Sequence, residues 1–239
     1  MKAICIPAKG RPTRLKQLVA SLNKAGLSEH GYKLFVGVEP GDETVNRVCL
    51  EYPSLGILYN SVTKGRGWNH YAVAQYAFEL CAKMVVFLEA DLIVASDTLE
   101  LCDWFFERRD EYYGMSLLSP VLEDGYRRKK TGIVEVGFVS RFCMVYGRDS
   151  WYKTIQPGWM YNGQGWDAAR ENDVFYSKKR VLSPEVSRIQ HPGCVDSSVL
   201  TEEESNDIFY GDIFFEADTG DEHPLAYSIS RPAGTVIRR

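Results

Sequence analysis

The sequence lacks the patterns that mark disulfide-rich, zinc-binding and membrane proteins. Its six cysteines are scattered over 239 residues without a Cys-x-x-Cys pair, so we expect reduced thiols in a cytoplasmic protein. No stretch approaches the ~20 apolar residues that a membrane span requires. The segment 1–7 is too short for the apolar region of a signal peptide. The formal net charge of −4 gives no overall electrostatic reason to bind nucleic acid or an anionic membrane.

Two common nucleotide-binding signatures are also missing. The pattern Gly-x-x-x-x-Gly-Lys-Ser/Thr does not occur, and this excludes a standard phosphate-binding loop. No Gly-x-Gly-x-x-Gly follows the first predicted strand, which disfavours a dinucleotide-binding protein. The segment Lys9-Gly10-Arg11 precedes Pro12, and it resembles an anion-binding turn at the start of a helix.

Apolar runs alternate with segments of helical periodicity through residues 3–88. This order predicts a doubly wound α/β fold with a parallel sheet in the first half of the chain. We expect strands at 3–8, 32–38, 55–59 and 84–88, separated by helices near 12–26, 44–51 and 68–82.

The second half of the chain is less regular. We expect Asp97 to cap a helix, and we expect a loop followed by a helix within 163–176. Residues 195–207 are polar and acidic, which is typical of a mobile loop. No internal repeat or linker interrupts the chain, so we predict a single domain with a mixed second half. Its short elements are expected to be strands at 115–118, 134–139 and 142–146 and a helix at 149–155.

The most informative segment is the apolar run 84–88, which ends in Glu89 and Asp91. Its length and composition predict a buried strand. Two unpaired acids would be costly to bury there, so a positive group should lie beside them. A divalent cation is the usual partner of clustered oxygen ligands, and open α/β sheets bind ligands at the carboxyl ends of their strands. The alternative interpretation is a pair of surface acids at a strand end.

Several other polar residues follow or flank predicted strand ends and could line the same crevice, although each alone also fits a solvated surface. They are Arg11, Glu39, Arg66 and His70. Farther along the chain, His191 precedes Pro192 and Gly193, where it could contact a metal or a phosphate. The basic run 127–130 follows Tyr126 and could contact the phosphates of a nucleotide or of a nucleic acid; the alternative is a solvated loop.

The segment Gly165-Trp166-Asp167 combines a flexible backbone, a flat apolar wall and a carboxylate. Asp167 could accept a proton from an acceptor hydroxyl, because a general base must be a carboxylate or an imidazole within hydrogen-bond reach. It could equally be a residue that only caps a helix.

Taken together, these segments resemble the GT-A glycosyltransferases, and within them the N-acetylglucosaminyltransferase I type. Residues 6–11 resemble the family's first strand and its arginine-bearing turn, and 36–44 resemble its second strand. Residues 70–78 resemble the helix before the family's metal-binding motif, and 85–97 resemble that motif. Residues 165–167 and 182–188 resemble the Trp-Asp base motif and the Arg-Pro-Glu-Ile-Ser-Arg segment that follows it.

The resemblance implies a Rossmann-like mixed sheet flanked by helices, with a nucleotide-sugar-binding half at 1–95 and an acceptor-binding half at 96–239. It implies Mn²⁺ or Mg²⁺, a UDP-sugar donor and inverting transfer to an acceptor hydroxyl. The acceptor stays open among a saccharide, a lipid-linked glycan, a protein and a hydroxymethylated DNA base, and the basic segment 126–130 is the feature that suggests DNA. The implied roles are metal ligation by Asp91, with Glu89 acting through water or the nucleotide, base recognition by Glu39, donor contacts by Arg11 and His70, and catalytic proton abstraction by Asp167.

The chain departs from the family pattern at two points. Ala90 stands where the family has a second aspartate, so the identity of the donor sugar stays open. The family's secretory anchor is also missing, and we therefore expect a cytoplasmic enzyme of a bacterium or a virus. A nucleotidyltransferase that acts on a sugar phosphate and a non-catalytic module that binds sugar or nucleic acid are the alternative functions.

Overall fold

The computed structural model describes residues 1–52, 55–63, 65–119, 129–136, 143–159, 179–192 and 227–229. The first half alternates strands and helices: β1 (Lys2–Ala8), α1 (Pro12–Lys24), β2 (Tyr32–Val38), α2 (Glu43–Leu50), β3 (Gly56–Tyr59), α3 (Gly65–Glu79) and β4 (Met84–Leu88). The second half holds short elements: β5 (Ile93–Val94), α4 (Thr98–Phe106), β6 (Gly114–Ser116), β7 (Gly132–Val136), β8 (Cys143–Gly147), α5 (Arg148–Ser150), η1 (Trp151–Ile155), α6 (Gln156–Trp159), β9 (Val181–Pro184), β10 (Ile189–Gln190) and β11 (Ser228–Ile229).

Nine strands form one sheet in the order β11-β7-β9-β6-β8-β4-β1-β2-β3, and β5 pairs with β10 in a separate small ladder. Strands β3, β2, β1 and β4 run parallel, as predicted from the alternation of strands and helices. Strand β8 is antiparallel to both β4 and β6, which makes the sheet mixed. The carboxyl ends of the four parallel strands therefore meet at one edge of the sheet, where α/β folds bind their ligands.

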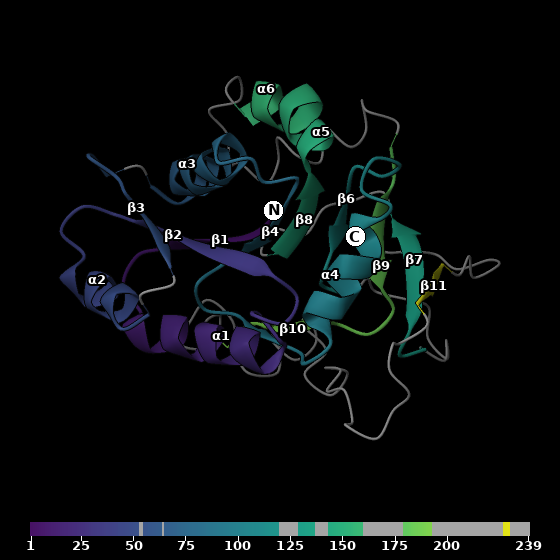
Figure 1. Cartoon of the computed structure of the whole chain (residues 1–239), viewed down its shortest axis with the longest axis horizontal. Coiled ribbons are helices and arrows are strands. Elements are labelled where there is room, and N and C mark those ends of the chain that lie inside the picture. Colours follow the sequence, from purple (N-terminus) through teal and green to yellow (C-terminus); the bar gives the residue numbers. More distant parts are fainter. Residues whose placement is uncertain are drawn as a thin grey trace.

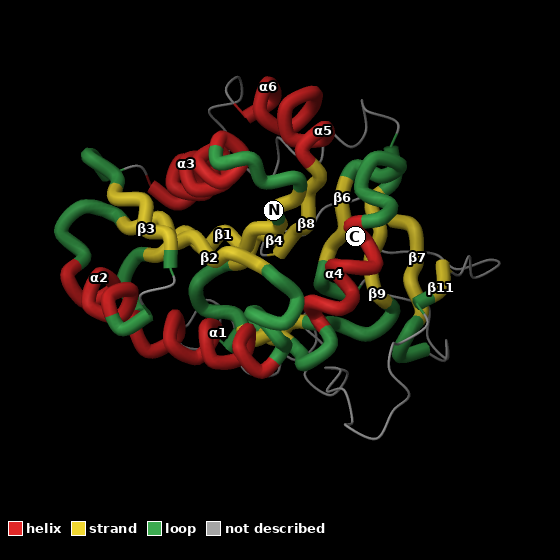
Figure 2. The backbone as a smooth tube through the Cα atoms, in the orientation of Figure 1, coloured by secondary structure: helices red, strands yellow, loops and turns green. Residues whose placement is uncertain are grey.

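Helices cover both faces of this sheet (Figures 1 and 2). One apolar cluster joins α1, α2 and α4 to the sheet through residues such as Leu18, Val48 and Leu99. The other cluster joins α3 and η1 to the opposite face through Phe78 and Trp151. Strand β4 is buried at all five positions because helices cover both of its faces, and this explains why its sequence is a continuous apolar run.

Element positions in the first half agree closely with those predicted from the sequence. Strands β2 and β4 have the predicted bounds, whereas α3 begins and ends three residues before the predicted range 68–82. The later strands begin one or two residues from their predicted starts, and β6 is shorter than the predicted range 115–118. Residues 163–176 and 195–207 lie outside the described residues, so the loop and helix expected there stay predictions.

Asp97 occupies the N-cap position of α4, as predicted, but its side chain makes no capping hydrogen bond. Its carboxylate instead accepts hydrogen bonds from Arg188 and Tyr227. The prediction of a capping role was therefore wrong in its chemistry, because a buried arginine from a distant segment takes the carboxylate.

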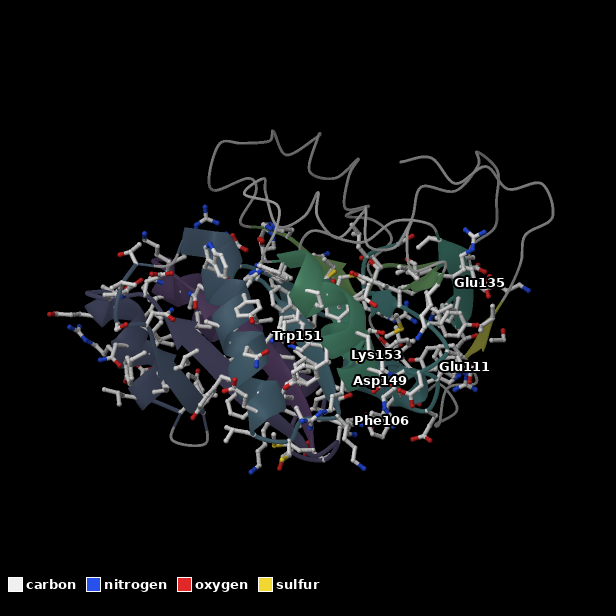
Figure 3. The ribbon with its side chains drawn as sticks, turned by 90° about the horizontal axis from the view of Figure 1, so that it is seen from above. Phe106, Glu111, Glu135, Asp149, Trp151 and Lys153 are labelled. Carbon is white, nitrogen blue, oxygen red and sulfur yellow. The ribbon has the colours of Figure 1, made fainter. Side chains whose placement is uncertain are left out.

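The helix predicted at 149–155 is longer and irregular, and it continues through α5, η1 and α6 from Arg148 to Trp159. Lys153 and Asp149 of this segment form an exposed ion pair at 2.6 Å. Both are labelled in Figure 3, together with Trp151. The Trp151 ring stacks on Phe78 of α3 with centroids 5.4 Å apart, and its indole N–H donates to the Gln75 side chain at 2.9 Å. These contacts fix the segment on the α3 face.

The described cysteines are all free thiols, as the scattered spacing predicts: Cys5, Cys49, Cys81, Cys102 and Cys143. Of these five described thiols, Cys81 alone is exposed. Burial raises the pKa of the Cys49 thiol to about 11, which keeps it protonated and unreactive at neutral pH. Among the described residues, no helix is long and apolar enough to cross a membrane.

Candidate functional site

A cavity of about 230 Å³ opens at the carboxyl edge of the parallel strands. The turn after β1, the end of β2, the first turns of α3 and the acidic segment after β4 contribute its walls. It is lined by Pro7, Ala8, Lys9, Arg11, Glu39, Asn69, His70, Glu89, Ala90 and Asp91. The parallel register places these segments together, because Ala8 pairs with Val38 and Cys5 with Phe87.

Glu89 and Asp91 are nearly inaccessible to solvent, with 4% and 5% of their surface exposed. Positive or protonatable groups approach them from two sides. Arg11 donates a hydrogen bond from Nη1 to Asp91 Oδ2. His191 Nε2 lies 3.3 Å from Glu89 Oε2 and 3.5 Å from Asp91 Oδ1. Arg11 of the chain itself therefore supplies a positive partner of the kind expected beside the acids, because buried carboxylates need such compensation.

His191 reaches the acids through the small antiparallel ladder of β5 and β10. Strand β5 begins two residues after Asp91, and β10 ends immediately before His191. The ladder pairs Gln190 with Ile93 and Ile189 with Val94. Two segments about 100 positions apart in sequence thus deliver their polar side chains to the same end of one ladder.

The turn that carries Arg11 has an unusual backbone. Gly10 and Arg11 both have positive φ, at 61° and 53°. This is routine for glycine but costs energy for a residue with a Cβ atom. Pro12 then begins α1 at a position where its fixed φ is favourable. The geometry holds because the Asp42 carboxylate accepts the backbone N–H of Gly10.

Asp42 joins this turn to the start of α2, because it also accepts the backbone N–H of Val45 at 3.1 Å. Partial burial favours the neutral carboxyl and raises its pKa. The hydrogen bonds from Gly10 and Val45 favour the carboxylate, and in sum the pKa of Asp42 lies below its ordinary value. The carboxylate is therefore ionised at neutral pH and fixes the turn after β1 to the start of α2.

The first turns of α3 are tied to β2 and β3 by a buried amide pair. Asn69 Nδ2 donates to the Gly37 carbonyl at 2.9 Å, and Asn60 Nδ2 donates to Asn69 Oδ1 at 2.9 Å. A Cβ atom on Gly37 would lie 2.3 Å from Asn69 Oδ1, so only glycine admits this approach. The next residue, His70, is fully buried and packs edge-on against Phe87, with ring centroids 4.0 Å apart.

The donor set fits a divalent cation. Glu89, Asp91 and His191 each offer one ligand atom, and these atoms lie within 4.8 Å of one another. Carboxylate oxygens suit Mg²⁺, Ca²⁺ and Mn²⁺, whereas an imidazole is a poor ligand for Mg²⁺, which prefers oxygen and water. Lys9 and Arg11 line the same cavity and would face an anionic ligand there.

Five of the residues proposed from the sequence line this one cavity: Arg11, Glu39, His70, Glu89 and Asp91. Arg66 belongs to the first turn of α3, but the described part of the structure does not include its side chain, so its role stays a prediction. Asp167 falls within 160–178, which the structure does not describe, so its role stays a prediction. Sequence reasoning missed Asn69 and gave His191 little weight, because a single histidine before a proline carries no spacing signal.

Searches for known relatives by sequence find nothing: no family model matches the chain, and no curated protein matches it. Solved structures do match. The S. aureus TarS crystal structure has a TM-score of 0.56 at 13% identity, over 79% of this chain and 36% of that chain. A TarS 1–349 structure in complex with UDP-GlcNAc has a TM-score of 0.58 at 12% identity, over 77% and 56%. The mannosyltransferase PcManGT from Pyrobaculum calidifontis, in complex with GDP-Man and Mn²⁺, has a TM-score of 0.53 at 14% identity, over 77% and 54%.

The matched region thus spans between about a third and just over half of each of these three proteins. Identities near 13% are too low to carry function from one protein to another, since one fold hosts many activities. The TM-scores of 0.53 to 0.58 show a shared fold. The chain has the mixed α/β GT-A fold, with a largely parallel sheet flanked by helices.

Proposed function

We propose that the protein is a metal-dependent glycosyltransferase that transfers a sugar from a UDP-sugar to an acceptor hydroxyl. The observation that carries the proposal is the buried group of Glu89, Asp91 and His191. The two acids line a cavity at the carboxyl edge of the parallel strands, and His191 lies beside them. The structural neighbours support the same class, because one was solved with UDP-GlcNAc and another with GDP-Man and Mn²⁺.

Glu89, Asp91 and His191 would hold the cation, and the histidine favours Mn²⁺ over Mg²⁺. When bound, the cation would supply Lewis-acid stabilisation of the departing diphosphate. The chain contributes further positive charge from Lys9 and Arg11, which line the cavity. These side chains would orient the diphosphate and balance its charge in a partly dry site, where electrostatic interactions are stronger than in water.

The nucleoside end of the donor would lie toward Glu39. This buried residue lines the main cavity and also an adjoining one of about 120 Å³, whose walls include Asp42, Asn46 and Tyr59. A carboxylate there can accept an N–H from a nucleobase. Arg11 and His70, the donor contacts that the family resemblance implies, belong to the same proposal, as does Arg66, which was inferred from its position beside a predicted strand end.

Asp167 would take the proton from the acceptor hydroxyl as that oxygen attacks the anomeric carbon from the side opposite the leaving UDP. This assignment implies inversion at the anomeric carbon, and it places acceptor binding in residues 96–239. The acceptor would be a glycan or a hydroxymethylated DNA base, as inferred from the sequence.

The proposal is tested by incubating the full chain with a panel of UDP-sugars and with GDP-mannose, with and without Mn²⁺, and by measuring slow donor hydrolysis. We expect release of UDP that requires the metal. Release of pyrophosphate from a sugar phosphate and a nucleoside triphosphate would instead identify a nucleotidyltransferase. If neither reaction occurs while nucleotide still binds, the protein is a binding module. Repeating the active combination with glycans and with plain and hydroxymethylated DNA identifies the acceptor.

A further inference from the structure

The metal-binding group is the set of Glu89, Asp91 and His191. At the other end of the β5–β10 ladder lies a buried ion pair that the proposed chemistry does not use. Arg188 and Asp97 both have side chains with no exposed surface, and Arg188 Nε lies 2.9 Å from Asp97 Oδ2. The hydroxyl of Tyr227 donates to the same oxygen at 2.8 Å. Burying two charges is costly, so a pair that is retained in the interior calls for a role beyond packing.

Arg188 uses its whole guanidinium and its backbone to join distant segments. Nη1 donates to the Val186 carbonyl and Nη2 to the Lys130 carbonyl, both at 2.6 Å. Its own carbonyl accepts from the Ala95 N–H at 3.0 Å and from the Thr98 hydroxyl at 3.2 Å. The segments before α4, before β7 and before β10 are therefore all hydrogen-bonded to one residue, Arg188.

These contacts lie at one end of the β5–β10 ladder, and the metal-binding group lies at the other. Asp91 precedes β5 and Asp97 follows it; Arg188 precedes β10 and His191 follows it. The ladder itself has only two residue pairs. A short two-stranded pairing is marginal on its own in water, so its register must be set by contacts outside it.

Register matters here because side chains alternate between the two faces of a strand. A slip of one residue would turn every side chain of β10 and its flanks to the other face. His191 would then point away from Glu89 and Asp91. Between Arg188 and His191 the chain advances about 10 Å, at ~3.3 Å per residue, which is too far for Arg188 to contact the acids itself.

We propose that the Asp97–Arg188–Tyr227 cluster sets the register of the β5–β10 ladder and thereby positions His191 on the metal-binding acids. Arg188 is in this view a positioning residue, and it acts through His191. The inference rests on the proposed metal-binding role of Glu89, Asp91 and His191. Its test therefore includes one measurement that needs no metal.

The register is measured in the metal-free protein with the paired substitutions Ile93→Cys and Gln190→Cys. These residues lie directly opposite each other, where Cβ atoms are ~4.5–5.5 Å apart, close to the separation that a disulfide requires. Peptide mapping gives the rate of this disulfide under mild oxidation. We expect Arg188→Lys to slow it at least fivefold, because lysine keeps the charge but cannot make the three side-chain hydrogen bonds. An unchanged rate would overturn the inference.

Mn²⁺ affinity is then measured by calorimetry in a double-mutant cycle. We expect Arg188→Lys to weaken Mn²⁺ binding roughly tenfold, as is typical when a group that orients a metal ligand is lost. In the His191→Ala background the same substitution should change the affinity less than twofold, because its effect passes through the histidine. An equal effect in both backgrounds would mean that Arg188 merely supports the fold, and this would refute the proposal.

A milder pair of variants covers the case in which Arg188→Lys does not fold. Tyr227→Phe removes one hydrogen bond to a buried aspartate near the ladder. Tyr32→Phe removes a tyrosine–aspartate bond of the same length, 2.8 Å, to the partly exposed Asp103, at the opposite end of the parallel strands. We expect Tyr227→Phe, and not Tyr32→Phe, to slow the disulfide and weaken Mn²⁺ binding; equal behaviour would contradict the inference. If the unaltered chain binds no Mn²⁺ while the disulfide rate still depends on Arg188, the metal proposal fails and the role in register stands.

Discussion

Replacing Gly37 by alanine should damage both the stability of the fold and the cavity. The added methyl group would lie 2.3 Å from Asn69 Oδ1 and 3.2 Å from Val73 Cβ. Asn69 lies on α3 and is buried where this helix packs against β2, so its side chain cannot rotate into solvent. Its displacement would break the hydrogen bonds to the Gly37 carbonyl and from Asn60.

The cost follows from two effects. Inserting a methyl group into a packed interior costs about 1–3 kcal/mol, and each lost buried hydrogen bond costs about 1 kcal/mol more. We expect a loss of about 3–5 kcal/mol in the free energy of unfolding. For a chain of this size, this lowers Tm by about 6–20 °C. Urea unfolding followed by circular dichroism measures the change.

The double variant Gly37→Ala/Asn69→Ala is the control. Asn69→Ala alone also loses both hydrogen bonds, but it frees the space that the new methyl group needs. The double variant should therefore be little less stable than Asn69→Ala, with a coupling close to the full cost of Gly37→Ala, about 3 kcal/mol. Additive effects of the two substitutions, or a Gly37→Ala protein within about 0.5 kcal/mol of the unaltered chain, would refute the proposed close approach.

Four further predictions concern single residues. Asp91→Ala should abolish metal-dependent UDP binding, and unchanged affinity in calorimetry would count against its role as a metal ligand. Asp167→Asn should retain UDP binding and lose transfer; normal turnover in that variant would remove the base assignment. The lowered pKa of Asp42 contributes stability that is complete above its ordinary pKa of 3.8 and is lost as the pH falls through the lower folded-state value. Urea midpoints measured between about pH 5 and pH 2 should therefore drop less steeply for Asp42→Asn than for the unaltered chain, and equal slopes would contradict this. Cys81 is the exposed thiol among the described cysteines, so Cys81→Ser should remove one fast-reacting group in a thiol titration of the folded protein; an unchanged fast phase would show that Cys81 is protected.

Local sequence patterns predicted much of the fold because they reflect local physics. The apolar run 84–88 identified β4, because a strand covered on both faces must be apolar throughout. The spacing of Leu15, Leu18 and Leu22 identified the buried face of α1, because 3.6 residues per turn place them together. The acids after β4 were expected to lie in a crevice at the sheet edge, and they do line a cavity there, because parallel strands collect their carboxyl ends at one edge.

The sequence by itself determined which strand ends bear charge and that two acids require a positive neighbour. Only the tertiary structure decided which neighbours these are. The β5–β10 ladder brings His191 to Asp91 across 100 residues, and Arg188 takes the carboxylate of Asp97 that local rules assign to helix capping. Such pairings depend on chain crossings and register, which a single sequence does not encode as a local pattern.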